Sequence, residues 1–363
     1  MTLAVNIAQG GSNNVTFRNK LINGNMVIDQ RNAGASVSPN TSVDVFPCDR
    51  FAVQASQNSK CTAQQVTTAP TGFKNSLKIT SSSAYSVGVN DYFDIYQKIE
   101  GYNVADMAFG TASAVTFTLS FWVQSSLTGT FGGSVYNNAF NRSYPFSYTI
   151  SSANTWEYKT VTITGDTSGT WTTDNTCGLG VGFGLGVGTN YSGTAGAWTG
   201  SGKFSATGAV SVVGTSGATF YITGVQLEAG TTASPFEYRQ YGLELSLCLR
   251  YYEKTYSQGV VPGTSTESNV EWAGTSFQSL ASTGTFQAQL RPFKVIKRAA
   301  PTMTFWDMVG NQGKWTRYLV GGGPNNNNTV TVDSQDDCGF RMFVAGTSST
   351  SNATGHWTAS AEL

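Results

Sequence analysis

The chain has 363 residues, enough for two domains of ordinary size, and only 12% of them are charged, about half of the usual fraction. Its 21 basic and 21 acidic residues give a formal net charge of zero, and no run of lysines or arginines could neutralise a row of phosphates, so nucleic acid is not an expected partner. No stretch approaches the ~20 apolar residues of a spanning helix, so we expect no membrane insertion.

Residues 1–16 are small and polar without clear periodicity, and we interpret them as an N-terminal arm or anchor. A frayed terminus is the alternative. The segment has no basic stretch followed by an apolar core, so it does not read as a secretory signal. The folded part is expected to begin at Phe17 with a hairpin, because apolar runs at 21–22 and 26–28 flank the turn signal Asn23-Gly24-Asn25.

Short strands are predicted through the first two thirds of the chain, at 48–55, 76–81, 92–100, 115–123, 146–150, 156–164, 178–188 and 221–228. The clearest is 115–123, where apolar side chains at odd positions alternate with threonine, serine and Trp122. Glycine, serine and asparagine separate the strands, and no helical pattern lies between them. This arrangement predicts an antiparallel sandwich of the jelly-roll kind over residues 17–236.

The run at 178–188 has glycine at every even position and leucine, valine or phenylalanine at every odd one. As a strand it would have one apolar face and one bare face, which another backbone or a flat ring could approach closely. It is not a phosphate-binding loop, because neither Lys-Ser/Thr nor a helix follows it. A close-packed interface and a groove for a sugar are the two interpretations.

One segment, 237–254, is predicted to hold a linker helix, which we place at 241–254. Leu243, Leu247 and Tyr251 recur every fourth residue, although the leucines also alternate as in a strand. We prefer the helix because leucine, glutamate and arginine favour helices and residues 241–254 include no β-branched residue. A helix so apolar needs cover, which a domain junction or an oligomer axis would supply, so Leu243, Leu247 and Tyr251 are the predicted oligomer contacts.

The strand pattern restarts over 255–363 and predicts a second, smaller β-sandwich. Its strands are expected at 276–289, 293–297, 302–308, 314–319, 329–332, 339–345 and 357–363. Pro324 and the four asparagines after it are expected to form the tip of a loop.

Signals for catalysis or metal binding are weak. The single histidine, His356, excludes a multi-histidine metal site and is interpreted as structural. No pair of carboxylates stands out for glycoside hydrolysis. Asp166 and Asp174 lie near glycine or in loops and are read as turn residues, with calcium binding as the alternative. Five scattered cysteines without a C-x-x-C spacing indicate neither a disulfide framework nor a zinc site. We therefore expect no enzymatic activity, no cofactor and no metal.

Aromatic side chains are the better binding candidates, because flat rings stack on the apolar faces of sugars while neighbouring polar groups bind the hydroxyls. For any single ring, packing in the core is the alternative. The candidates that lie on the polar side of a strand or near loops are Trp122, Trp156, Trp171, Tyr191, Trp198, Trp272 and Trp315.

Several blocks of the sequence resemble a family of phage and prophage tail-fibre or virion appendage proteins. They include NKLINGNMVIDQR at 19–31, ATFYITGVQLEAGTTASPFEYR at 218–239, LCLRYYEK at 247–254 and HWTASAEL at 356–363. The resemblance extends over residues 17–363. It implies a virion structural protein with a jelly roll similar to carbohydrate-binding modules at 17–236, a helical linker at 237–254 and a C-terminal β-domain at 255–363. It also implies a homotrimer.

From this resemblance we expect a fibre or spike subunit that is made in the bacterial host cytoplasm and becomes part of the virion. Residues 1–16 would attach it to other virion proteins, and the β-domains would bind polysaccharide of the host surface. The alternative is an architectural virion protein, a head decoration or fibre connector, that has no ligand of its own. A glycan depolymerase is the least favoured reading, for want of a distinct carboxylate pair.

Overall fold

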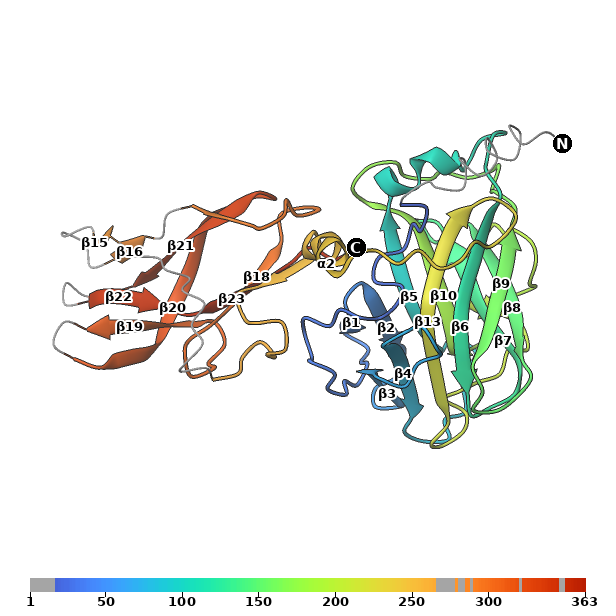
Figure 1. Cartoon of the computed structure of the whole chain (residues 1–363), viewed down its shortest axis with the longest axis horizontal. Helices are drawn as coiled ribbons and strands as arrows, with labels where there is room; N and C mark the ends of the chain where they lie inside the picture. The colour runs from blue at the N-terminus through green and yellow to red at the C-terminus, as the bar shows by residue number, and fades with distance from the viewer. Residues whose placement is uncertain (1–16, 266–277, 280–284, 288–289, 320–321, 346–349) are drawn as a thin grey trace.

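The structure, a computed structural model, describes residues 17–265, 278–279, 285–287, 290–319, 322–345 and 350–363. It consists of two β-domains joined through a short helix, with the N-terminal domain in blue to yellow and the C-terminal one in orange and red (Figure 1). Within the described ranges, no helix has both the length and the apolar character that crossing a bilayer requires.

Two antiparallel sheets form the N-terminal domain. The six-stranded sheet has the order β1 (Val45–Cys48), β2 (Phe51–Ala55), β5 (Tyr92–Glu100), β10 (Cys177–Val187), β7 (Gly129–Tyr136) and β8 (Ser143–Ile150). The five-stranded sheet has the order β3 (Cys61–Val66), β4 (Ser76–Ser81), β13 (Thr219–Ala229), β6 (Phe117–Ser125) and β9 (Glu157–Ile163). The predicted all-β jelly-roll sandwich is thus confirmed.

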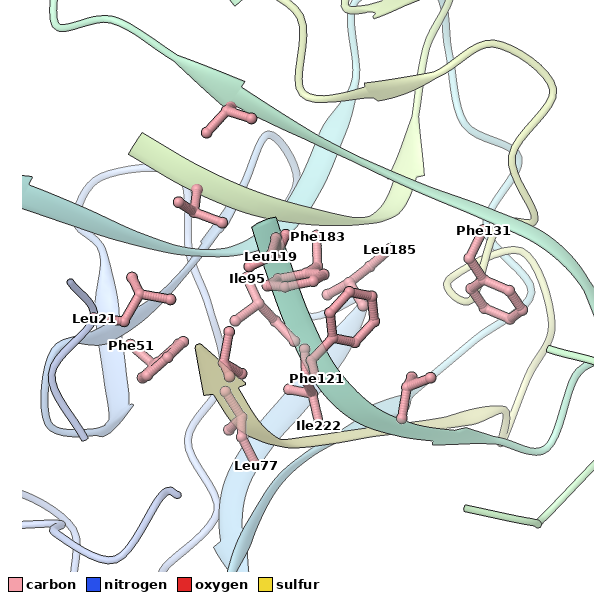
Figure 2. Packing of buried hydrophobic residues seen from close by; sticks show 14 of the residues in the cluster. Leu21, Phe51, Leu77, Ile95, Leu119, Phe121, Phe131, Phe183, Leu185 and Ile222 are labelled. Atoms are coloured by element: carbon pink, nitrogen blue, oxygen red, sulfur yellow. The ribbon is translucent and has the colours of Figure 1, made fainter. Parts of the chain in front are cut away.

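The core of this domain lies between the two sheets. Alternation along each strand turns one face inward, so that Phe121 and Ile222 of the five-stranded sheet meet Phe183 and Leu185 of the other (Figure 2). The rings of Phe121 and Phe183 are 5.0 Å apart between centroids at an angle of 73°. Burying each such side chain stabilises the fold by roughly 1.5–3 kcal/mol.

The bare face of β10 is covered by the chain itself. A Cβ atom at Gly184 would lie 2.7 Å from Ser205 Oγ, and one at Gly186 would lie 2.5 Å from Val213 Cγ2. At Gly180 a Cβ would lie 2.2 Å from the Tyr136 ring. Gly184 and Gly186 therefore let the segment after β10 pack closely on the sheet, and Gly180 makes room for the Tyr136 ring, so the interpretation as a sugar groove is wrong.

The hairpin expected at 21–28 is also wrong. The chain turns at Asn23, which has a positive φ of 58°, but the flanking residues are irregular and pack along β13 instead of pairing with each other. Lys20 N donates to Leu227 O at 2.8 Å and Val225 N donates to Gly24 O at 2.9 Å. Contact with β13 has replaced the local pairing.

Helix α2 (Tyr241–Leu249) is confirmed, but it is shorter than the expected 241–254. After Arg250 the chain enters β14 (Tyr252–Lys254), whose residues pair with β23 (His356–Ser360) of the C-terminal domain. The alternating pattern that competed with the helix therefore prevails in the last residues, because a neighbouring strand is present there to accept the backbone hydrogen bonds.

The C-terminal domain holds a three-stranded sheet of β14, β23 and β18 (Thr302–Trp306) and a seven-stranded sheet. Trp315, Phe340 and Trp357 lie in the small core that these strands form. The larger sheet contains β15 (Gln278–Ser279), β16 (Thr285–Gln287), β17 (Arg291–Pro292), β19 (Lys314–Leu319), β20 (Pro324–Gln335), β21 (Gly339–Ala345) and β22 (Thr350–Thr354).

Two local predictions in this domain are wrong. Pro324 and the asparagines after it belong to β20, because they pair with β19 and Asn328 Oδ1 accepts a hydrogen bond of 2.7 Å from Arg317 Nε. Residues 293–297 form no strand; Lys297 N instead donates to Asp337 O at 2.8 Å. Much of the expected strand at 276–289 lies outside the described residues.

The domains meet at a junction formed by α2 and the last residues of the chain, which end beside that helix in Figure 1. Glu362 pairs with Arg31 at 2.9 Å and also with Arg50. Arg298 Nη1 donates to Asn175 O at 3.1 Å, and Asn175 Nδ2 donates to Arg298 O at 2.8 Å. These contacts join the C-terminal domain to the jelly roll a second time, beyond the covalent connection through α2.

Candidate functional site

The outer face of the five-stranded sheet carries aromatic and polar side chains in rows that cross the strands. Strand register places Thr223, Trp122 and Tyr158 side by side in one row. Because side chains alternate along a strand, these three face away from the core that holds Ile222 and Phe121. The Trp122 and Tyr158 rings are 5.4 Å apart between centroids, and Tyr158 is 43% exposed.

A hollow of about 580 Å³ opens over this row, which we call the aromatic groove. One side is the sheet, and the other is formed by the loop before β4 and the segment after β13. Its lining consists of Thr71, Phe73, Ser120, Trp122, Tyr158, Gly224, Ala233, Ser234, Pro235, Phe236 and Tyr238.

Three rings build the wall that rises from the sheet. Phe236 packs against Phe73 at 5.2 Å and against Tyr238 at 4.9 Å between centroids. The Tyr238 hydroxyl donates to Gly72 O at 2.9 Å, which ties the wall to the loop before β4. Tyr238 nevertheless remains 57% exposed, so its ring is available to a ligand.

A glycine makes room for this wall. Gly224 lies at a bulge in β13 and has a φ of +62°, in the left-handed region that favours glycine. A Cβ at this position would lie 2.7 Å from Phe73 Cζ and 3.1 Å from Trp122 Cδ1. The bulge therefore lets the rings of Phe73 and Trp122 approach the backbone.

Buried polar contacts hold the segment after β13 in place. Glu228 accepts hydrogen bonds from Ser234 N at 2.8 Å and from Ser234 Oγ at 2.6 Å. Gln226 Oε1 accepts a bond of 2.8 Å from Glu237 N. The segment that carries Phe236 and Tyr238 is thus fixed to the strand beneath it, and the groove is preformed.

The predicted binding residues lie in different places. Trp122 lines the groove, and Trp156 lies near it, 6.1 Å from the Tyr221 ring. Trp171 and Trp198 pack on one another at 5.5 Å, partly inside the core of the jelly roll. Tyr191 packs on Phe204 at 5.5 Å, over the six-stranded sheet. The structure therefore brings two of the predicted residues together on one face.

Trp315 and Tyr251 are not available for the roles that were predicted for them. Trp315 is fully buried in the C-terminal core. Tyr251 is only 1% exposed, and its hydroxyl donates to Glu100 at 2.5 Å within the same chain. Leu243 is 40% exposed and Leu247 is half-buried, so these two remain open to contact with another chain. Trp272 lies outside the described residues.

Five groove or near-groove rings were missed by sequence reasoning, namely Phe73, Tyr158, Tyr221, Phe236 and Tyr238. Tyr158 carried a signal, since it occupies the polar phase of a predicted strand as Trp122 does. Tyr221 did not, because simple alternation groups it with Val225 and Leu227, and the bulge in β13 reverses that phase. The other three lie in irregular segments, where no periodicity indicates direction.

The candidates for catalysis or metal binding have structural partners. His356 is buried and stacked on Tyr256 at 3.9 Å, and burial lowers its pKa to about 4. Asp166 accepts two hydrogen bonds from Arg142, of 2.7 and 2.6 Å. Asp174 accepts bonds from Thr176, which lower its pKa. Each group thus has a role in its own turn or core.

A larger hollow, of about 680 Å³, lies beside Arg18, Lys20, Asp106 and Glu228. Its charges are paired with one another, since Lys20 lies 2.8 Å from Asp106 and Arg18 lies 3.8 Å from Glu228. One ring, Phe17, lines it. The aromatic groove, with its preformed rings, is the better candidate for a ligand.

No protein-family model matches the sequence, and no curated protein matches it. Similar solved structures include a putative sugar binding protein from Bacteroides thetaiotaomicron, with 11% identity, a TM-score of 0.31 and coverage of 58% of this chain and 100% of the other. Another is a family 11 carbohydrate-binding module from Clostridium thermocellum, with 12% identity, a TM-score of 0.27 and coverage of 56% and 98%.

A third similar structure is the enzymatically active domain of tailspike protein 4 from bacteriophage CBA120, with 13% identity and a TM-score of 0.30. The likeness covers 59% of this chain and 22% of the tailspike chain, so this chain spans about a fifth of that structure. The properties in these names belong to those proteins, and the case for this chain rests on its own groove.

Proposed function

We propose that this chain is a non-enzymatic binding protein for polysaccharide of a host cell surface. The observation that carries the proposal is the aromatic groove, where Trp122, Tyr158 and Tyr238 offer ring faces around a preformed hollow. Flat rings stack on the apolar faces of sugars, and the hydroxyls of Ser120, Ser234 and Thr71 lie in the same lining.

The groove suits binding better than hydrolysis. Glycoside hydrolysis uses two carboxyl groups that flank the scissile bond. Within the described part of the chain, the lining of the groove contains no aspartate or glutamate. The nearby Glu228 is engaged with Ser234. A bound sugar chain would therefore be held without being cleaved.

The proposal includes a place in a phage virion, as a fibre or spike subunit that forms a homotrimer. Its support is the resemblance of the sequence blocks at 19–31, 218–239, 247–254 and 356–363 to virion appendage proteins. The exposed side chains of Tyr241 and Leu243 on α2 fit contact with further copies of the chain, and residues 1–16 would attach the trimer to other virion proteins.

A second candidate is an architectural virion protein, which the exposed apolar side chains around α2 favour. Tyr241, Leu243, Phe17 and Tyr102 are all exposed there, and such a surface suits contact with another protein.

Light scattering on the wild type and on Leu243→Gln tests this surface. A trimer mass that is reduced in the variant supports it, and a monomer in both removes the homotrimer.

Binding to an array of bacterial surface polysaccharides tests the main proposal. We expect the wild type to bind at least one polysaccharide and Trp122→Ala or Tyr158→Ala to weaken that binding by about tenfold or more, as for a central aromatic contact. Val89→Ala is the control, because this exposed apolar side chain is not part of the groove lining. Wild-type signals no higher than a blank, or equal signals for all variants, would remove the proposal.

A further inference from the structure

A second row of side chains crosses the same face of the five-stranded sheet, next to the row of Trp122. Strand register places Gln64 beside Lys78, Lys78 beside Tyr221, and Tyr221 beside Gln124. Trp156 closes the row, with its ring 6.1 Å from that of Tyr221. We call these five residues the lysine row.

The lysine row is continuous with the aromatic groove. Tyr221 and Thr223 are two residues apart on β13, and Gln124 and Trp122 are two residues apart on β6. Two residues along a strand span about 7 Å, so the two rows lie roughly that far apart on one surface. A single extended sugar chain that lies across both rows would contact the rings of each.

Lys78 is the distinctive group of this row. Its ammonium lies 5.7 Å from the centroid of the Tyr221 ring. Over the residues that the structure describes, it forms no ion pair with a carboxylate, whereas Lys20, Lys159 and Lys297 each do. The groups beside it, Gln64 and Tyr221, are uncharged.

The surrounding face leaves this positive charge uncompensated. The other outward positions of β3, β4 and β13 around it are uncharged, namely Thr62, Val66, Ser76, Thr80, Thr219 and Thr223. Lys74 follows Phe73 at the groove and is exposed. The acidic side chain on this face, Glu228, lies toward the other end of β13 and accepts bonds from Ser234.

We propose that the groove and the lysine row together bind an acidic polysaccharide, and that Lys78 pairs with a carboxylate of its sugar residues. The inference rests on the proposed function and names the class of its ligand. An ammonium is a compact point charge with three donors, and the carboxylate of an acidic sugar offers two oxygens that accept hydrogen bonds from it. Trp156 and Tyr221 supply ring faces for the sugar that carries the acid, and the amides of Gln64 and Gln124 supply partners for its hydroxyls.

The test uses the full chain and an array of bacterial surface polysaccharides, each printed in its native form and in a form whose carboxylates have been reduced to alcohols. The proteins are the wild type, Lys78→Gln, Lys78→Arg and the control Lys203→Gln. Lys203 is a suitable control because it lies in the segment that covers the other sheet, where it donates to Asn190 O.

We expect native acidic polysaccharides to bind the wild type about tenfold more tightly than their reduced forms, as for one charge-assisted hydrogen bond. Lys78→Gln should lose that preference and bind both forms alike, while Lys78→Arg and Lys203→Gln should keep most of it. Added salt should weaken binding of the native form to the wild type and have little effect on Lys78→Gln.

The failures of the two proposals are distinguishable. Binding that is equal for native and reduced forms, or unchanged in Lys78→Gln, would overturn the acidic ligand and leave glycan binding intact. Loss in Lys78→Gln of binding to a polysaccharide whose only charges are phosphate or sulfate would assign Lys78 to that anion and overturn the carboxylate. No binding to any printed polysaccharide would overturn both proposals.

Discussion

The two outer faces of the jelly roll differ in what covers them. On the six-stranded sheet the strand β10 presents glycines, and the chain folds its own residues 188–213 over them. On the five-stranded sheet β6, β9 and β13 present Trp122, Tyr158 and Tyr221, which stay partly open to solvent. One face is buried within the molecule, and the other is free to meet a partner.

This difference shows that rows of glycines and rows of aromatic side chains have different roles in a β-sandwich. A row without side chains leaves space that the rest of the chain fills, because closely packed atoms gain dispersion energy that a void would lose. Rings that remain half exposed on the outer face are not stabilised by packing in the core. Such rings on the open face indicate a ligand more strongly than the glycine row does.

The largest expected effect concerns the covered face. In Gly184→Val the added atoms meet Ser205 at distances below 3 Å, since a Cβ there would lie 2.8 Å from Ser205 Cβ. We expect the free energy of unfolding to fall by about 3 kcal/mol, the upper range for an overpacked site. Thr160→Val on the open face is the control and should change it by less than about 0.5 kcal/mol. Urea unfolding measures both changes. Similar losses of unfolding free energy in the two variants would contradict the difference between the covered and the open face.

A smaller effect concerns Asp94, which β5 presents to the covered face opposite Gly184. Burial raises the pKa of Asp94 to about 8, and the charge of Asp44 adds to the shift. Between its ordinary pKa of 3.8 and about 8, the unfolded chain carries the charge while the folded chain keeps the proton. The contribution of Asp94 to the free energy of unfolding is therefore greatest below pH 4. It falls as the pH rises toward 8 and does not change further above pH 8.

Asp94→Asn removes this dependence, because its amide does not ionise. We expect the variant to gain stability over the wild type progressively from pH 4 to pH 8, by about 2 kcal/mol in total, since effective interior dielectric values reduce the full cost of burial. Urea unfolding at a series of pH values measures the difference. A gap between the two proteins that stays constant with pH would show that Asp94 ionises normally in the fold.

The smallest expected effect belongs to the open face. Gly224→Ala places a methyl group at a φ of +62°, which costs an L-residue about 1 kcal/mol or slightly more. The methyl also displaces Phe73, whose ring is only half-buried and can move aside. We expect a modest loss of stability together with a severalfold loss of polysaccharide affinity, measured by calorimetry. A variant with unchanged stability and full affinity would show that the groove does not depend on the glycine bulge.

The strands were predictable where alternation was strong, as at Ser76–Ser81 and Tyr92–Glu100, which match the expected bounds. β3 and β7 were missed because their sequences, CTAQQV and GTFGGSVY, lack a regular apolar phase. The asparagines after Pro324 were assigned to a loop, since their preference for turns is a local property. Pairing with β19, which sequence does not reveal, overrides that preference.

The candidate site was only partly predictable. Trp122 stood out because a large ring occupied the polar phase of a clear strand. The wall of Phe73, Phe236 and Tyr238 joins segments more than 160 residues apart, and their meeting depends on how the sheet is ordered. For the same reason sequence alone ranked Trp315 beside Trp122, although one is core and the other is surface.

The contacts of Glu362 with Arg31 and Arg50 have a mechanical consequence. The covalent connection through α2 alone would let the two domains rotate about it, whereas ion pairs beside that connection oppose the rotation. A pull on a sugar chain held at the jelly roll would then pass to the C-terminal domain as a load on a braced joint. Under flow, the molecule would respond as one stiff arm.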